Sequence, residues 1–311
     1  MGGVERRTFL KSCVVLGAGV QSGLWMPLPG WTADTAKMSI VRYKEQPVET
    51  DGVAEEAERL TRKAIELLGG MSRFISKGDV VWLKPNMGWD RTPEQAANTN
   101  PVVIGTLVKM CYEAGAKKVL VSDNPCNPAR MTFPRSGIQA AAKAAGAQVA
   151  FMDERHYKKM AVNGKVLKEW EIYADVVEAD KLINVPVVKH HELCEVSLSM
   201  KNLMGSIGGA RNRLHQDIHN TLPDLAAFFK PDLVVIDAIR ILKQNGPVGG
   251  NLVDVVRKDT MAAGTDCVAL DAFGTTLLER KPEEIGHIVE AAKRGLGVMD
   301  YASLNPVELV I

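Results

Sequence analysis

Short apolar runs alternate with amphipathic stretches along most of the chain. The runs are rich in Val, Ile and Leu, as in strands buried on both faces, and the stretches between them repeat apolar residues with a helical period. Strands are predicted at residues 39–43, 79–84, 118–122, 148–151, 181–185, 232–236, 260–264 and 307–311, and helices at 53–68, 101–114, 137–145, 266–278 and 282–294. This alternation predicts an α/β fold with a mostly parallel sheet flanked by helices.

The middle of the chain departs from this alternation. A more irregular stretch at residues 166–172 is followed by a polar, glycine-rich segment at 201–213 and by a short helix that we expect to reach about Thr221. We therefore expect a single α/β domain over residues 37–311, with an irregular inserted or second subdomain at about 155–215.

The first 36 residues show another pattern. Arg6 and Arg7 precede Thr8-Phe-Leu-Lys11 and an apolar, glycine-spaced stretch that ends at Pro27. This order is typical of a signal for the twin-arginine translocase. The stretch is short for a membrane span, although an uncleaved signal would still anchor the protein. We therefore expect residues 1–36 to be an export signal and the protein to be periplasmic, either released or membrane-anchored.

Charge and cysteine usage narrow the class of function. The net charge is +1 and the basic residues are dispersed, apart from Arg211 and Arg213, so no nucleic-acid partner is expected. The cysteines after the signal are Cys111, Cys126, Cys194 and Cys267. Because they stand singly, we expect no iron–sulfur cluster held by this chain alone, whereas disulfide pairing stays open.

Polar residues stand at or just past the C-terminal ends of several predicted strands. They are Lys84, Asn86, Asp123, Asn124, Asn184 and Asp237. In parallel sheets this edge binds ligands, although polar residues also end strands as turn formers. Lys84 favours a ligand, because a lysine directly after a buried strand seldom lies there without a partner. We expect Asn86 and Asp237 to bind a cofactor at this edge.

A glycine-rich loop at residues 205–213 precedes the expected short helix. Its backbone N–H groups and its two arginines suit an anion, although a solvated turn is the alternative. Lys201 and Asn202 stand just before the loop and, with Lys84, would form a cationic cleft in which one lysine has a lowered pKa and acts as a base or Schiff-base former. The ligand-binding residues expected in this segment are Asn202, Gly205, Gly208, Gly209, Arg211 and Arg213.

His215 and His219 are four positions apart on the expected short helix, so both imidazoles would project from one face at the border of the core. This placement suits a transition metal or a general acid–base pair. If a metal is bound, we expect His215 or His219 to ligate it with help from His190, His191 or Cys194. The alternative is a pair of boundary histidines that bond to the backbone.

Several motifs together resemble the domain-of-unknown-function family 362. They are Lys84-Pro-Asn86, Asn100-Pro101, Glu113-Ala-Gly-Ala116, Pro186-Val-Val-Lys-His190, Ser199-Met-Lys-Asn-Leu-Met-Gly205, Gly246-Pro247 and Asp266-Cys-Val-Ala-Leu-Asp271. The resemblance covers nearly the whole chain after the signal. It implies an α/β fold but no particular reaction. Many relatives carry a ferredoxin-like iron–sulfur segment, which this sequence lacks.

A second pattern resembles the lactate racemase family. His191 is followed by Lys201, by Gly205-Ser-Ile207, and by His215 or His219. The resemblance implies that His191 transfers a proton, that Lys201 tethers a nickel-containing cofactor, and that His215 or His219 ligates the nickel. The sequence departs from the family because no Gly-Gly-Arg precedes Lys201 and the glycine spacing after it differs by one.

Two functions fit these residues. The first is a periplasmic enzyme, racemase-like or another proton-transfer enzyme, that acts on a small anionic ligand through His191, Lys201 and Lys84. The second is a noncatalytic periplasmic protein that carries a metal or cofactor to a redox partner. A histidine and a lysine within proton-transfer reach of one pocket would favour the first, and an exposed His/Cys cluster without a pocket would favour the second.

Overall fold

The computed structural model describes residues 36–44 and 53–311, and the expected export signal with Arg6 and Arg7 lies outside these residues. In the described part, the main sheet has ten strands in the order β12-β1-β11-β10-β7-β2-β3-β4, with β8 and β9 attached beside β10. The strands are β1 (Met38–Arg42), β2 (Val80–Pro85), β3 (Lys118–Val121), β4 (Gln148–Val149), β7 (Lys181–Val185), β8 (Val187–His191), β9 (Glu195–Ser197), β10 (Leu233–Leu242), β11 (Val255–Gly264) and β12 (Val307–Val310).

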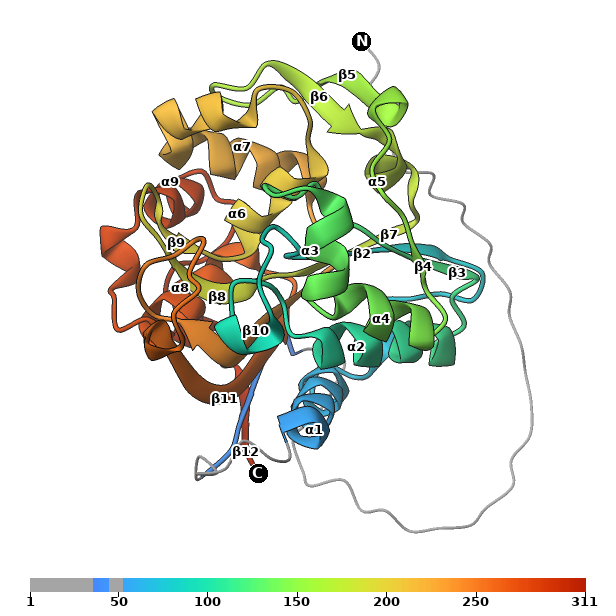
Figure 1. The fold of residues 1–311 in the computed structure, drawn as a ribbon. Coiled ribbons are helices and arrows are strands. Elements are labelled where there is room, and N and C mark those ends of the chain that lie inside the picture. Colours follow the sequence, from blue (N-terminus) through green and yellow to red (C-terminus); the bar gives the residue numbers. More distant parts are fainter. Residues whose placement is uncertain (1–35, 45–52) are drawn as a thin grey trace, which may run out of the picture. The chain divides into compact units, whose positions relative to one another are not determined.

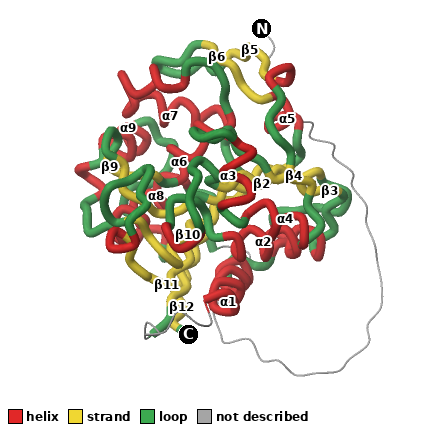
Figure 2. Tube along the Cα trace, viewed as in Figure 1, coloured by secondary structure: helices red, strands yellow, loops and turns green. Residues whose placement is uncertain are grey.

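The expected mostly parallel sheet flanked by helices is confirmed. Strands β4, β3, β2, β7 and β10 run parallel, and β11 pairs antiparallel with both β10 and β1. Figures 1 and 2 show the strands between two groups of helices. One group is α1 (Val53–Glu66), α2 (Pro101–Glu113), α3 (Ala129–Arg135) and α4 (Ile138–Ala144), and the other is α5 (Ala174–Glu178), α6 (Ser199–Asn202), α7 (Ile218–Phe229), α8 (Cys267–Leu277) and α9 (Gly286–Lys293).

Each face of the sheet has its own hydrophobic core because neighbouring side chains along a strand point to opposite faces. On β2, Val81 and Leu83 pack in the core beneath α1, α2 and α4, whereas Trp82 packs in the core beneath α6 to α9. The central strands are buried on both faces, which explains their almost continuous apolar sequences.

The region expected to form a subdomain, residues 155–215, is divided between two structures. Strands β7 and β8 join the main sheet, and only β5 (Tyr157–Ala161) and β6 (Glu169–Tyr173) form a separate two-stranded sheet. The turn of this hairpin is held by Asp224 of α7, whose carboxylate accepts the backbone N–H groups of Lys165, Val166 and Leu167. The hairpin is therefore fixed to the main domain.

The expected short helix before Thr221 also differs. Residues Arg211–Asp217 form a 3₁₀ helix, and α7 begins only at Ile218, after a break at Asp217 with φ of −140°. A 3₁₀ helix has about three residues per turn, so a spacing of four positions across this break no longer defines one face.

The described cysteines do not form disulfides. Cys111, Cys194 and Cys267 are buried as free thiols, and Cys126 is exposed. Between residues 36–44 and 53–311, no helix has both the length and the apolar character needed to cross a bilayer.

Helix α6 is short, and a buried carboxylate fixes its start. Asp271 of α8 is completely buried and accepts the backbone N–H groups of Ser199 and Met200, at 2.6 and 3.0 Å. These two N–H groups belong to the first turn of α6, where no intrahelical acceptor exists. Asp271 therefore sets the position of the helix that carries Lys201 and Asn202.

We expect Asp271→Asn to lower the free energy of unfolding by about 1–3 kcal/mol, because the new amide N–H group would face a buried backbone donor. Chemical denaturation measures this loss. Asp153→Asn is the control, since the exposed Asp153 caps a short turn through the N–H of Arg155 and Asn caps equally well. Equal losses in the two variants would contradict the role given to Asp271.

Candidate active site

The polar side chains at the C-terminal ends of the parallel strands meet around Lys84. This lysine is completely buried, and its Nζ donates to Asp123 Oδ1 at 2.7 Å, to the Pro85 carbonyl at 2.8 Å and to Asn202 Oδ1 at 3.2 Å. The other oxygen of Asp123 accepts the N–H of Met87 at 2.7 Å. Burial lowers the pKa of Lys84, and the attraction of the Asp123 carboxylate opposes this effect. The pair joins the ends of β2 and β3.

Asn202 extends this network to α6 and β7. Its Oδ1 accepts from Lys84 Nζ and from Asn86 Nδ2, and its Nδ2 donates to Asn184 Oδ1 at 2.8 Å and to the Lys84 carbonyl at 3.3 Å. These bonds use both acceptor positions and both donor hydrogens of the amide. The side chain that was expected to orient a ligand therefore holds α6 against the strand ends.

Gly205 lets the following loop lie directly on the Lys84–Asp123 pair. An ideal Cβ at this position would lie 1.7 Å from Asp123 Oδ1 and 2.6 Å from Lys84 Nζ. Its carbonyl also accepts the N–H of Asn124 at 2.9 Å. Only glycine fits this contact between the loop and the strand ends.

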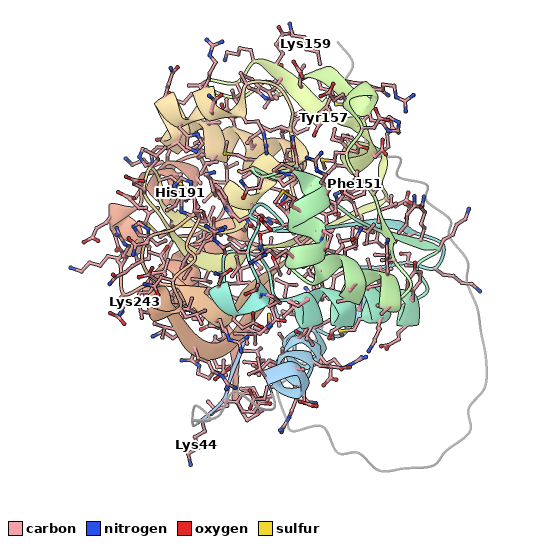
Figure 3. The ribbon with its side chains drawn as sticks, viewed as in Figure 1. Lys44, Phe151, Tyr157, Lys159, His191 and Lys243 are labelled. Carbon is pink, nitrogen blue, oxygen red and sulfur yellow. The ribbon has the colours of Figure 1, made fainter. Side chains whose placement is uncertain are left out.

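A cavity of about 480 Å³ adjoins this network, within the usual size range of small-molecule sites. Its lining includes Asn86, Trp89, Asp123, Cys126, Lys189, His191, Glu192, Leu193, Lys201, Asn202, Met204, Gly205, Gly209, Arg211, His215 and Pro247. His191, labelled in Figure 3, stands at the end of β8. The structure thus brings Lys201, Asn202, Arg211 and His215 to one cavity, while Lys84 lies behind its wall in contact with Asn202.

The cavity is lined by more positive than negative charge. Lys189 Nζ donates to the Ala97 carbonyl at 2.6 Å and to Asn86 Oδ1 at 3.2 Å, and burial lowers its pKa to about 7. Burial also lowers the pKa of Lys201, whose Nζ has no hydrogen-bond or ion-pair partner in the described part of the chain. The described acidic residues of the lining are Asp123, which pairs with Lys84, and Glu192, which is exposed.

Two histidines face each other at the cavity, with ring centroids 5.7 Å apart. His191 Nδ1 accepts the N–H of Leu193 at 3.1 Å, so in the neutral ring the proton is on Nε2. His215 Nδ1 lies 3.1 Å from the Asn212 carbonyl, which only accepts, so the proton is on Nδ1 and the Nε2 lone pair is free. Burial and the nearby charge of Lys201 lower the pKa of both rings. The hydrogen bonds therefore make His191 a donor and His215 an acceptor.

The glycine-rich loop is held by contacts other than those expected. Arg211 donates to the carbonyls of Asn124, Met204 and Pro125 at 2.8–3.1 Å, so its guanidinium lines the cavity while it fixes the surrounding backbone. The N–H of Gly208 donates to the Glu171 carbonyl at 2.8 Å and is not directed at an anion, whereas Gly209 does line the cavity. Arg213 is exposed and is not part of the lining.

Of the expected metal ligands, the cavity brings together His191 and His215, whereas His190, Cys194 and His219 are not part of its lining. His219 lies against the buried His287 of α9, with ring centroids 6.2 Å apart, and is not part of the lining that contains His215. His190 Nδ1 accepts the N–H of Gly246, and the Cys194 thiol is 3.4 Å from the Val196 carbonyl. Within residues 36–44 and 53–311, no three His, Cys, Asp or Glu side chains are arranged to hold a metal ion.

Asp237 also lies outside the cavity lining. Its carboxylate accepts the N–H groups of Asn100 and Ile239 at 2.7 and 3.1 Å, while burial raises its pKa to about 6. These bonds tie the start of α2 to β10, so Asp237 has a structural role. Asp237 stands inside β10, and the strand end expected after Ile236 lies at Leu242.

Sequence reasoning did not assign Lys189 and Trp89 to the site. Lys189 is buried in β8, a strand that the sequence patterns did not predict, so its place at the cavity depends on how β8 packs. Trp89 follows β2 in a loop and has its ring centroid 6.0 Å from Lys189 Nζ. The sequence signal for Lys189 is its place between two valines and two histidines.

Residues 81–276 match the model of the family described as domain of unknown function DUF362. The thylakoid-associated protein sll1697 of Synechocystis sp. is 26% identical over 262 residues, which cover 80% of each chain. The lactate racemase apoprotein from Thermoanaerobacterium thermosaccharolyticum has a TM-score of 0.41 and 14% identity over 84% of this chain, which spans 59% of the length of that structure. The family match extends over more than half of the sequence, and the chain therefore belongs to the DUF362 family.

Proposed function

We propose that this chain is an enzyme that binds an anionic substrate in the 480 Å³ cavity and transfers a proton at a carbon atom next to a carboxylate. One observation carries the proposal: the Lys201 ammonium reaches the cavity without a partner among the described residues, beside two histidines whose tautomers are fixed as donor and acceptor. An unpaired cation beside an acid–base pair is the arrangement that this reaction class requires.

The cations supply the binding energy for the anion. Lys84 and Arg211 are engaged by Asp123 and by backbone carbonyls, so Lys201 is the cation left to meet a ligand, and Lys189 lies beside it. A bound carboxylate would restore the protonated form of both lysines, whose pKa values burial lowers. The same charges would stabilise the negative charge that develops when a proton leaves the adjacent carbon.

The histidines divide the proton transfer between them. His215 offers the Nε2 lone pair as the base, because its Nδ1–H is bonded to the Asn212 carbonyl. His191 offers Nε2–H as the donor, because its Nδ1 is occupied by the N–H of Leu193. Their lowered pKa values keep both rings neutral near neutral pH, so that His215 can accept the proton while His191 donates a hydrogen bond to the negative charge that develops.

A noncatalytic carrier of a metal for a redox partner is the second candidate. The concave cavity with lysine and histidine side chains favours the enzyme, since a carrier would be expected to present an exposed His/Cys cluster. A metal held by protein ligands also fits the described residues poorly, because no three of their His, Cys, Asp or Glu side chains lie together. The proton transfer proposed here uses the chain's own side chains.

The cavity also offers an attachment point for a cofactor that supplies the metal-binding atoms itself. The Lys201 amine is unpartnered in the described structure and is the one that such a cofactor would use for attachment, with His215 Nε2 as the free imidazole nitrogen beside it. When bound, such a group would supply redox chemistry that amino-acid side chains lack. Binding of the anionic group and placement of the proton would remain with Lys189, His191 and His215.

We expect the protein to exchange the hydrogen on the carbon next to the carboxylate for deuterium in a panel of 2-hydroxy and 2-amino carboxylates dissolved in D₂O. Proton NMR follows the loss of the signal. His215→Gln is expected to slow the exchange by about 100-fold or more, as is typical for loss of a general base, and Lys201→Met to slow it at least as much.

Lys159→Met is the matched control, because Lys159 is exposed on β5 and lies at the edge of the molecule in Figure 3. This variant should exchange at the wild-type rate. Carboxylate binding that depends on Lys201, without exchange of hydrogen in any compound, would establish the noncatalytic alternative. Exchange that is unchanged in Lys201→Met would exclude the cavity as the site.

The affinity for a 2-hydroxy carboxylate should fall as the pH rises through 7. Lys189 has a lowered pKa of about 7 in the free protein and must take up a proton to attract the anion above that pH. The linkage predicts up to about a tenfold loss of affinity per pH unit. Calorimetric titrations at several pH values measure it. Lys189→Met should bind more weakly at low pH and show a shallower slope, and an unchanged slope would refute the assignment.

We also propose that the protein is exported by the twin-arginine translocase, on the strength of Arg6 and Arg7 before the apolar stretch. The double substitution of Arg6 and Arg7 by Lys should leave the protein in the cytoplasm, as measured by cell fractionation. The double substitution of the exposed Arg130 and Arg135 by Lys is the control and should not alter export. Export of the first variant at the wild-type level would rule out the signal.

A further inference from the structure

We propose that the substrate of this cavity is a carboxylate with an aromatic body, such as an aryl-substituted 2-hydroxy acid. The inference rests on the proposed function for the anionic group and extends it to the rest of the molecule. It depends on the volume of the cavity and on the apolar side chains that surround its entrance.

The cavity is too large for a three-carbon acid alone. Its volume of about 480 Å³ lies within the range of sites that bury drug-sized ligands. A short hydroxy acid has only a handful of non-hydrogen atoms and would leave most of this space to water. A substrate that fills a site of this size has the dimensions of a ring attached to a short acidic chain.

The lining contains charged and apolar side chains that come from different elements. Lys201 and Arg211 come from α6 and from the 3₁₀ helix before α7. Trp89, Leu193 and Pro247 come from the loops after β2, between β8 and β9, and between β10 and β11. Ligands with an anionic group and an apolar body match such a division, because each part then meets its own kind of surface.

Leu193 is not a member of the hydrophobic cores of the described structure. Leu193 is 62% exposed although it lines the cavity. A single exposed leucine is ordinary. An exposed leucine that shares a cavity with a tryptophan and a proline, however, contributes binding free energy when a ligand buries it. The apolar contact therefore favours a substrate that removes these side chains from water.

Trp89 favours a substrate whose apolar part is an aromatic ring. Its ring packs on Ala96, Ala97 and Leu242 on one side of the site, and Lys189 Nζ lies 6.0 Å from the ring centroid. A second ring that meets Trp89 in an offset or edge-to-face arrangement gains more than its buried area alone provides. The acidic group of the same molecule would then lie within reach of Lys189, which links the two parts of the lining.

The test compares lactate with 3-phenyllactate, which share the same acidic group and differ by the phenyl ring. Calorimetric titration of the full chain at about pH 6.5 gives both dissociation constants. We expect phenyllactate to bind at least about tenfold more tightly than lactate, as an added apolar group in a matching pocket provides. Leu193→Ser should weaken phenyllactate binding by about tenfold and leave lactate binding unchanged.

Leu252→Ser is the matched control, because Leu252 is 58% exposed and does not line the cavity. It should change neither affinity. Equal affinity of the two acids, an equal effect of Leu193→Ser on both, or no binding of either would overturn the inference. Tight phenyllactate binding without exchange of its carbon-bound hydrogen would instead refute the proposed proton transfer and leave the aromatic substrate standing.

Discussion

The buried ammonium of Lys84 is the interaction on which the site depends. Removing a charge of this kind from water costs several kcal/mol unless acceptors surround it. Three acceptors do so here: the Asp123 carboxylate, the Pro85 carbonyl and the Asn202 amide oxygen. Since these groups come from β3, from β2 itself and from α6, the charge is satisfied only when all of these elements are in place.

The positive charges of the region have separate tasks. Lys84 and Arg211 are surrounded by protein acceptors and hold strand ends and loop backbone together. Lys189 has two neutral acceptors, a carbonyl and an amide oxygen, and also lines the cavity. Lys201 alone among these cations lacks a protein acceptor in the described structure. Similar residue types thus acquire different chemistry from the acceptors that the fold places beside them.

The α/β fold and the gathering of Lys84, Asn86 and Asp123 could be predicted, because both follow from local patterns and from the rule that ligand-binding residues stand at the C-terminal ends of parallel strands. The relation of His215 to His219 could not, since it depends on where a 3₁₀ helix gives way to α7. The position of Arg213 outside the lining and the full burial of Lys189 depend on tertiary packing, about which one sequence says little.

The network around Asn202 joins residues that are far apart in the sequence. Asn202 and Lys84 are separated by 118 positions, and Asp271 is 72 positions from the Ser199 N–H that it accepts. Contacts of such separation form late in folding, because a long loop must close before they form. The cavity therefore does not exist in a partly folded chain, and a ligand that fills it binds only the complete fold. Such a ligand would act as a stabiliser of the whole domain, and the midpoint of thermal unfolding would rise with its concentration.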